Sequence, residues 1–206
     1  MLTTSEIRWF YQGEVAPAIK NWFTKDVLRE NCQTFEQRED WYLRIPGCEF
    51  LGVKLRQKQL ESKLRVAELG VLYLSKNVIG SAEKWVKWSC DDPEAESLIT
   101  SEVVAKGEWV KVEKARSQIR YLIADDGSLI PTSTTGTSQV GCNVELTQLI
   151  VDRDRWWSLG FETSGKSDDL MPILEAVTNK VFQTFPEEEL SLRNSYAYPK
   201  WLSLFV

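Results

Sequence analysis

Cations alternate with apolar residues along residues 52–66, GVKLRQKQLESKLRV. Successive side chains of a β-strand point to opposite faces, so a hairpin that turns at Gln59-Leu60 gathers the cations on one face. The cations of this stretch are Lys54, Arg56, Lys58, Lys63 and Arg65, and the apolar residues of the other face are Val53, Leu55, Leu64 and Val66. In this register Arg56 faces Lys63, and like charges directly opposite each other destabilise a sheet. Gln59-Leu60 is a poor turn dipeptide, so a longer loop or a bulge is the alternative register.

A second segment repeats the pattern with Lys114, Arg116, Gln118 and Arg120. One interpretation is an exposed sheet face that the cations keep soluble. The other is a closed barrel with an apolar outside covered by helices, because the inside of such a barrel can be polar and wide. Cations gathered inside it would need an anion of high charge density, such as phosphate. We expect Lys54, Arg56, Lys63 and Arg116 to converge in one cavity.

Composition excludes several function classes. The chain has 206 residues, 43% of them hydrophobic, which suits a single domain over residues 1–206. Its net charge of −5 argues against a general nucleic-acid-binding protein. Histidine is absent, which excludes Ser-His-Asp and Cys-His catalysis and most zinc sites. The chain shows no signal peptide and no apolar run of membrane-spanning length, so we expect a cytoplasmic protein without membrane contact.

The periodicity of the sequence predicts an α+β protein built on an antiparallel sheet. The predicted helices cover 15–30, a segment from the N-cap Asp92 to Gly107, and 167–185. The predicted strands and hairpins cover 5–13, 40–45, 52–66, 70–75, 81–90, 109–131 with an Asp126-Gly127 turn, and 139–151 paired with 156–164. About eight strands, mostly linked by hairpins, indicate a closed or nearly closed eight-stranded barrel. We expect Trp22, Phe23 and the apolar face of helix 167–185 to pack on its outside, leaving no central hydrophobic core.

Four glutamates form a candidate metal site. Pairing 139–151 with 156–164 across the turn DRDR places Glu145 opposite Glu162. Two facing carboxylates repel unless one is protonated or a cation lies between them. Glu6 and Glu83 lie on other predicted strands, and clustered carboxylates suit Mg²⁺ or Mn²⁺ bridging to substrate phosphates. The alternative is a set of unrelated surface glutamates.

The order of these motifs resembles the CYTH, or triphosphate tunnel metalloenzyme, superfamily over most of the chain. The matching motifs are Glu6 in EIRWF, Lys54-x-Arg56 followed by Lys63, Glu83-x-Trp85 followed by Lys87, Lys114-x-Arg116, and the late acidic residues Glu145 and Glu162. The departures are Arg8, Phe10, Trp85 and Ser164, which stand where the family has carboxylates or a lysine. The anion-binding half of the pattern is therefore better preserved than the metal-binding half.

The resemblance implies an eight-stranded tunnel that binds a triphosphate or polyphosphate-type anion and, in active members, hydrolyses it with a divalent metal. The implied catalytic residues are Glu6, Glu83 and Lys63, and the implied ligands of Mg²⁺ or Mn²⁺ are Glu6, Glu83, Glu145 and Glu162. The implied anion-binding residues are Lys54, Arg56, Lys58, Lys63, Arg65, Lys87, Lys114, Arg116 and Arg120. The alternatives are a metal-dependent phosphohydrolase and a non-catalytic protein that binds an anion or a protein partner. We expect a small phosphorylated anion as the ligand, with weak or absent hydrolysis; the sequence does not identify a protein partner.

Overall fold

The computed structural model describes the chain except for residues 29–33, 57–58, 92–101, 103–105, 107, 125, 134–138, 166–168 and 206. The strands are β1 (Leu2–Gln12), β2 (Thr34–Leu43), β3 (Leu51–Arg56), β4 (Gln59–Ser75), β5 (Val78–Asp91), β6 (Trp109–Ile123), β7 (Leu129–Thr132), β8 (Gly141–Val151) and β9 (Asp154–Ser164). The helical elements are α1 (Pro17–Trp22), the π-helical turn η1 (Phe23–Val27), α3 (Met171–Phe182), the 3₁₀ turn η3 (Leu192–Asn194) and α4 (Tyr198–Leu202). The predicted helix from Asp92 to Gly107 falls almost entirely outside the described residues, as does the predicted helix start at Ser167.

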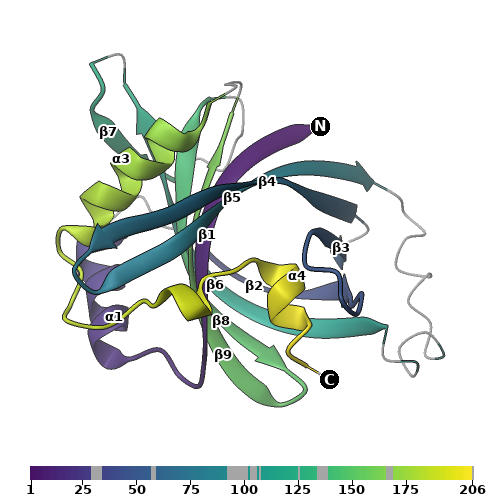
Figure 1. The fold of residues 1–206 in the computed structure, drawn as a ribbon. Helices are drawn as coiled ribbons and strands as arrows, with labels where there is room; N and C mark the ends of the chain where they lie inside the picture. The colour runs from purple at the N-terminus through teal and green to yellow at the C-terminus, as the bar shows by residue number, and fades with distance from the viewer. Residues whose placement is uncertain are drawn as a thin grey trace.

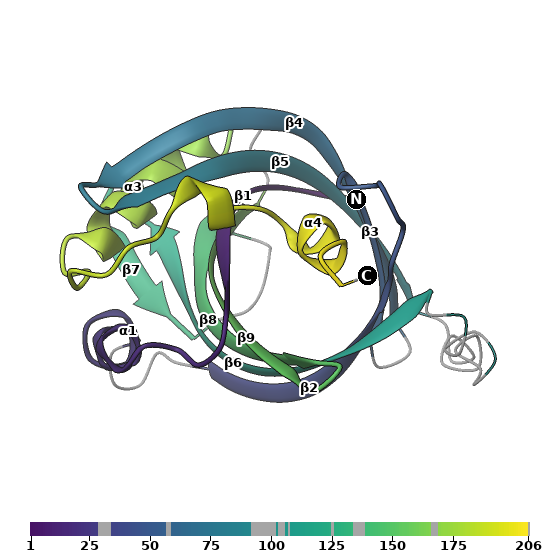
Figure 2. The ribbon, with the colours of Figure 1, turned by 60° about the horizontal axis from the view of Figure 1, so that its bottom comes forward.

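The strands form a closed antiparallel barrel of eight strands, which confirms the predicted fold class (Figures 1 and 2). The order around the barrel is β2-β3-β4-β5-β1-β9-β8-β6, and pairing of β6 with β2 closes the ring. Strand β7 pairs with the far end of β6 and continues the sheet beyond the ring. Closure leaves these eight strands with partners on both sides and gives the sheet an inner and an outer face.

The β3–β4 hairpin turns between Arg56 and Gln59, two residues earlier than predicted. Lys54 therefore lies opposite Glu61 and Lys63 lies opposite Gly52, so the predicted facing cations are wrong. In this register Lys54 faces a carboxylate and Lys63 faces a glycine, so the repulsion of the two predicted like-charge pairs is absent. Because the shift keeps the strand parity, the cations of this hairpin that the structure describes still share one face. Lys58 lies outside the described residues.

The β8–β9 hairpin also differs from the prediction by its register. Asp152 and Arg153 adopt positive φ angles of 49° and 75°, the conformation of a two-residue type I′ turn. Val151 then pairs with Asp154, which places Glu145 opposite Gly160 instead of Glu162. The residue that faces Glu162 is instead Glu6, which lies opposite Glu162 on β9 and opposite Glu83 on β5. The facing carboxylates thus come from β5, β1 and β9.

The outer face of the barrel carries the larger hydrophobic core. Ile7 and Trp9 of β1 belong to the same buried cluster as Trp22 and Phe23 near the N-terminus and Leu174, Val177 and Phe182 of α3. The Trp9 ring contacts the Phe182 ring edge-on, with 5.9 Å between their centroids. These helices lie outside the barrel, as expected. Among the described residues, no helix combines the length and the apolar content needed to cross a membrane.

The C-terminal helix α4, in contrast, lies within the barrel opening (Figure 2). Its Trp201 is fully buried and stacks on Phe10 of β1, with 5.0 Å between the ring centroids. A second hydrophobic cluster therefore fills one half of the lumen, and its buried members are Phe10, Tyr42, Val110, Val112, Leu149, Val151, Trp201 and Leu202. The expectation that no hydrophobic core lies inside the barrel is wrong, because the inward-facing positions at this end are apolar.

We predict that Trp201→Ala lowers the free energy of unfolding by about 3–5 kcal/mol, the usual cost of truncating a buried tryptophan. Trp88, which is 43% exposed on β5, provides the matched control. Urea denaturation should show a loss for Trp88→Ala of well under half that size. Equal losses in the two variants would contradict the placement of α4 inside the lumen.

Candidate anion-binding site

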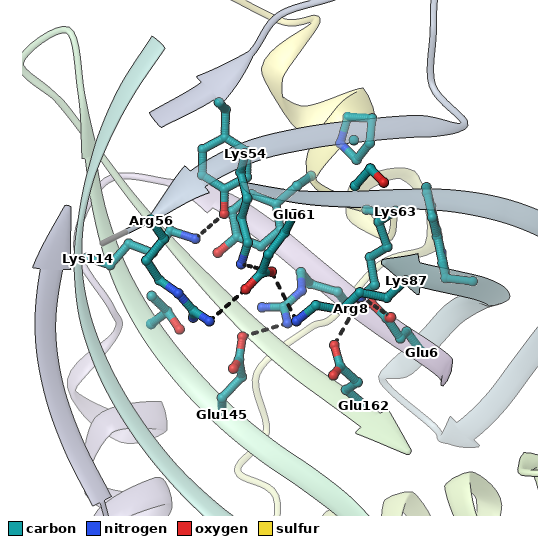
Figure 3. A pocket seen from close by; sticks show the side chains of 18 of the residues that line it. Glu6, Arg8, Lys54, Arg56, Glu61, Lys63, Lys87, Lys114, Glu145 and Glu162 are labelled. Carbon is teal, nitrogen blue, oxygen red and sulfur yellow. Dashed lines mark hydrogen bonds and ion pairs between the residues drawn. The ribbon is translucent and has the colours of Figure 1, made fainter. Parts of the chain in front are cut away.

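The inward faces of β1 and β6 change from apolar to charged along the barrel axis. On β1 the inner residues run Phe10, Arg8, Glu6, and on β6 Val112 is followed by Lys114. The charged half encloses a cavity of about 150 Å³ whose wall is completed by Tyr198 and Pro199 of α4. The cations that line it are Arg8, Arg38, Lys54, Arg56, Lys63, Lys87, Lys114 and Arg116, and the carboxylates are Glu6, Glu61, Glu145 and Glu162 (Figure 3).

Glu61 of β4 gathers three of these cations. Its carboxylate lies 2.8 Å from Lys54 Nζ, 2.7 Å from Arg56 Nη2 and 3.0 Å from Lys87 Nζ. Burial opposes its ionisation, but the surrounding cations lower the pKa of Glu61 to about 2. Burial lowers the pKa of Lys54 to about 7. We call these four residues the Glu61 cluster; it holds three cations and one carboxylate.

Arg8 reaches Glu145 across the backbone of β9. Its Nη2 lies 2.5 Å from Glu145 Oε1, and its Nη1 donates a hydrogen bond of 3.1 Å to Ser158 Oγ. Gly160 makes this crossing possible, because a Cβ atom there would lie 2.5 Å from Arg8 Cζ. Burial disfavours ionisation of Glu145, but Arg8 and Arg116 hold its pKa well below the ordinary value.

Lys63 lies between two carboxylates. Its Nζ donates to Glu6 and, at 3.0 Å, to Glu162. Burial disfavours the charged ammonium, yet these carboxylates raise the pKa of Lys63 above its ordinary value. The pKa of Glu6 is raised by burial, whereas Lys63 and Lys87 outweigh burial and lower the pKa of Glu162.

Lys114 and Arg38 share the buried carboxylate of Asp40 on β2. Lys114 Nζ lies 3.1 Å from Asp40 Oδ2 and 4.0 Å from the centre of the Tyr198 ring, a cation–π contact. Burial lowers the pKa of Lys114 to about 8. Arg38 also contacts Glu36, and Glu36 in turn lies 2.7 Å from Arg116. Asp40 and Glu36, which do not line the cavity themselves, thus neutralise cations that do.

Several predicted residues lie elsewhere. Glu83 accepts hydrogen bonds from Arg65 at 2.5 Å and from Trp85 Nε1 at 3.1 Å, and neither Glu83 nor Arg65 lines the cavity. Arg120 is buried apart from the cavity and donates to Asn143, Ser164 and the carbonyl oxygen of Gln139. The other predicted anion-binding residues that the structure describes line the cavity together.

Sequence reasoning assigned no role to Arg38, Asp40 or Glu61, and it treated Arg8 only as a departure from a motif. Strand parity was the available signal, since Arg38 and Asp40 alternate with outward residues on β2 as Arg8 does with Ile7 and Trp9 on β1. The described residues contain no group of three or more aspartates, glutamates or cysteines arranged to hold a metal ion. A Mg²⁺ or Mn²⁺ site formed by Glu6, Glu83, Glu145 and Glu162 stays a prediction.

We predict that Gly160→Ala destabilises the fold by at least about 1–3 kcal/mol, because the new methyl group displaces the Arg8 guanidinium. In Gly52→Ala the added Cβ meets only Pro199 Cγ, at 3.3 Å, so the loss should be smaller. A double-mutant cycle with Arg8→Ala tests the cause: without the guanidinium, Gly160→Ala should cost markedly less. Additive losses in urea denaturation would contradict this explanation.

Comparison with known proteins gives little further information. No family model matches the chain, and no curated protein matches it. Among solved structures, the chain is similar to the crystal structure of a "putative adenylate cyclase" from Bacillus halodurans, with 9% sequence identity. The alignment covers 92% of this chain and 97% of that one, with a TM-score of 0.39. A likeness at this level does not assign a function.

Proposed function

We propose that this protein binds a phosphate-type anion, the end of a triphosphate or polyphosphate, in the charged half of its barrel, and that it acts as a binding protein rather than a hydrolase. The Glu61 cluster is the observation that carries the proposal. Lys54, Arg56 and Lys87 converge on a single carboxylate, and Glu61 is only 3% exposed. The three cations are half-buried, with side chains 20–26% exposed, and cations held together with too few anions cost free energy, so the cluster favours a second anion.

The charge balance of the lumen supports the same ligand. Among the described residues, eight cations and four carboxylates line the cavity, and Glu36 and Asp40, which pair with Arg116 and Lys114, bring the carboxylates to six. With every lysine protonated, the remaining surplus is two positive charges, which equals the surplus within the Glu61 cluster. A phosphate monoester carries about −1.5 to −2 charges at neutral pH, so one phosphoryl group would balance this surplus. The chain as a whole is acidic, whereas the lumen carries more cations than carboxylates.

The size of the cavity limits what enters it. Its volume of about 150 Å³ matches that of an engineered cavity that binds benzene. Pockets for drug-sized ligands measure roughly 300–1,000 Å³. One phosphoryl group fits the smaller volume, whereas a base and ribose do not. We therefore propose that a linear anion inserts one end and leaves the rest of its length outside the cavity.

Hydrolysis is the less favoured alternative. Metal-assisted hydrolysis needs carboxylates free to hold a divalent cation in register with the phosphate. Each glutamate of the predicted metal set is instead held by a cation of the chain: Glu6 and Glu162 by Lys63, Glu83 by Arg65, and Glu145 by Arg8 and Arg116. Because each glutamate is already paired with a cation of the chain, these pairs favour anion binding over metal-assisted hydrolysis. In the proposed function Lys54, Arg56 and Lys87 contact the phosphate oxygens, and Glu61 keeps the three cations in place.

We predict that Lys54→Met and Lys87→Met each weaken tripolyphosphate binding by about tenfold or more, because a charge-assisted hydrogen bond contributes about 1.5–3 kcal/mol. Lys111→Met is the matched control, since Lys111 pairs with Glu39 and Glu113 outside the cavity. Isothermal calorimetry measures the three affinities against the unmodified protein. Absence of binding, or an equal loss in Lys111→Met, would refute the proposed site.

The same samples distinguish a binding protein from a hydrolase. We predict no release of phosphate from tripolyphosphate over hours with Mn²⁺ present. Rapid release that disappears in Glu145→Ala would identify the protein as a metal-dependent phosphohydrolase.

We also predict that anion affinity falls as the pH rises from about 7 to 9. The pKa values of Lys54 and Lys114 are lowered to about 7 and about 8, so both amines lose their protons in this range in the free protein. A bound anion favours the protonated amines, so binding takes up protons and weakens with rising pH. Sulfate is the suitable probe, because its own charge stays constant over the range. A pH-independent affinity, or an unchanged slope in Lys54→Met, would contradict the assignment.

A further inference from the structure

The strand registers bring three carboxylates of the barrel into one transverse row. Glu6 of β1 lies directly opposite Glu83 of β5 on one side and Glu162 of β9 on the other. Directly opposite residues point to the same face of a sheet, so their carboxylates approach one another. Such a row is stable only when protons or cations offset the repulsion.

Strand β4 supplies both cations of this row. Lys63 donates to Glu6 and to Glu162, and Arg65, two residues further along the same face, donates to Glu83. Thr4 also donates a hydrogen bond of 2.5 Å to Glu6. Lys63 is held far more closely to this pair than to the Glu61 cluster, since no ion pair joins it to Glu61 among the described residues. Its ammonium therefore neutralises these carboxylates and does not belong to the surplus of positive charge in the Glu61 cluster.

We infer that the Lys63 ammonium takes the position between Glu6 and Glu162 that a divalent cation would otherwise occupy, so that the protein binds its anion without a metal. Mg²⁺ and Mn²⁺ are commonly held by only one or two carboxylates together with phosphate oxygens and water, so this pair would suffice for a site. A metal would have to displace an ammonium that is covalently tethered to β4 and paired with both carboxylates. The anion part of this inference rests on the proposed function, whereas the metal part stands on the geometry of Lys63.

The test replaces the ammonium by an uncharged side chain of similar shape. In Lys63→Met the two carboxylates lose their shared cation, and we expect the variant to gain one Mn²⁺ site at least tenfold tighter than any site in the unmodified protein. Electron paramagnetic resonance of free Mn²⁺ measures the binding without any anion present. The gain should disappear in Lys63→Met/Glu162→Gln, which removes one carboxylate charge.

Lys54→Met is the matched control. Lys54 lines the same cavity but pairs with Glu61, so its loss removes a lysine amine from the lumen without freeing Glu6 or Glu162. We expect no gain of Mn²⁺ binding in this variant. Circular dichroism establishes that each variant is folded, and Lys63→Gln replaces Lys63→Met if the methionine variant does not fold.

The unmodified protein supplies a measurement that needs no variant. Its affinity for free tripolyphosphate should be the same within twofold in EDTA and in the presence of Mn²⁺. The Mn²⁺ measurement is corrected for the tripolyphosphate that Mn²⁺ complexes in solution. Tight Mn²⁺ binding by the unmodified protein, or a folded Lys63 variant without a new Mn²⁺ site, would overturn the inference. Failure of sulfate to bind the unmodified protein would overturn only the proposed function, because the Mn²⁺ measurement contains no anion.

Discussion

Eight cations enclosed by one barrel must be neutralised within it, and this requirement governs the arrangement of the lumen. A buried charge without a partner costs several kcal/mol, so each cation must meet a carboxylate, an aromatic ring or a ligand. Lys63, Arg8 and Lys114 each form an ion pair with a carboxylate, and Lys114 also makes a cation–π contact with the Tyr198 ring. The Glu61 cluster is left with three cations around one carboxylate, and this is where we propose that an anion binds.

The C-terminal helix makes this requirement stricter. By filling the apolar half of the lumen, α4 closes one side of the cavity and reduces the space left for a ligand. Tyr198 belongs to both halves, since it stacks on Tyr42, 5.2 Å away, and borders the cavity. The same short helix therefore contributes to the inner hydrophobic cluster and to the wall of the proposed anion site. The outer core around Trp9 and α3 supports the sheet independently of the lumen.

Most of what could be predicted from the sequence came from the alternation of charged and apolar side chains along the strands. The alternation at Lys54 and Arg56 and again at Lys114 and Arg116 indicated a charged inner face, and barrel closure followed from the number of strands. Register could not be predicted, because it depends on turns whose residues gave weak signals: Asp152 and Arg153 adopt a left-handed conformation that glycine or asparagine usually takes. The position of α4 inside the lumen could not be predicted either. An aromatic helix of five residues packs equally well on either side of a sheet, and only the apolar ends of β1, β6 and β8 decide its place.

The account is tested most directly by an anomalous diffraction measurement on crystals soaked in selenate, a tetrahedral dianion of phosphate-like shape. We predict a selenium peak inside the lumen, with its oxygens about 2.7–3.2 Å from the side-chain nitrogens of Lys54, Arg56 and Lys87. The Glu6–Lys63–Glu162 contacts should remain unchanged around it. Selenate bound only on the outer surface, with the Glu61 cluster undisturbed, would contradict the claim that the lumen is an anion-binding site.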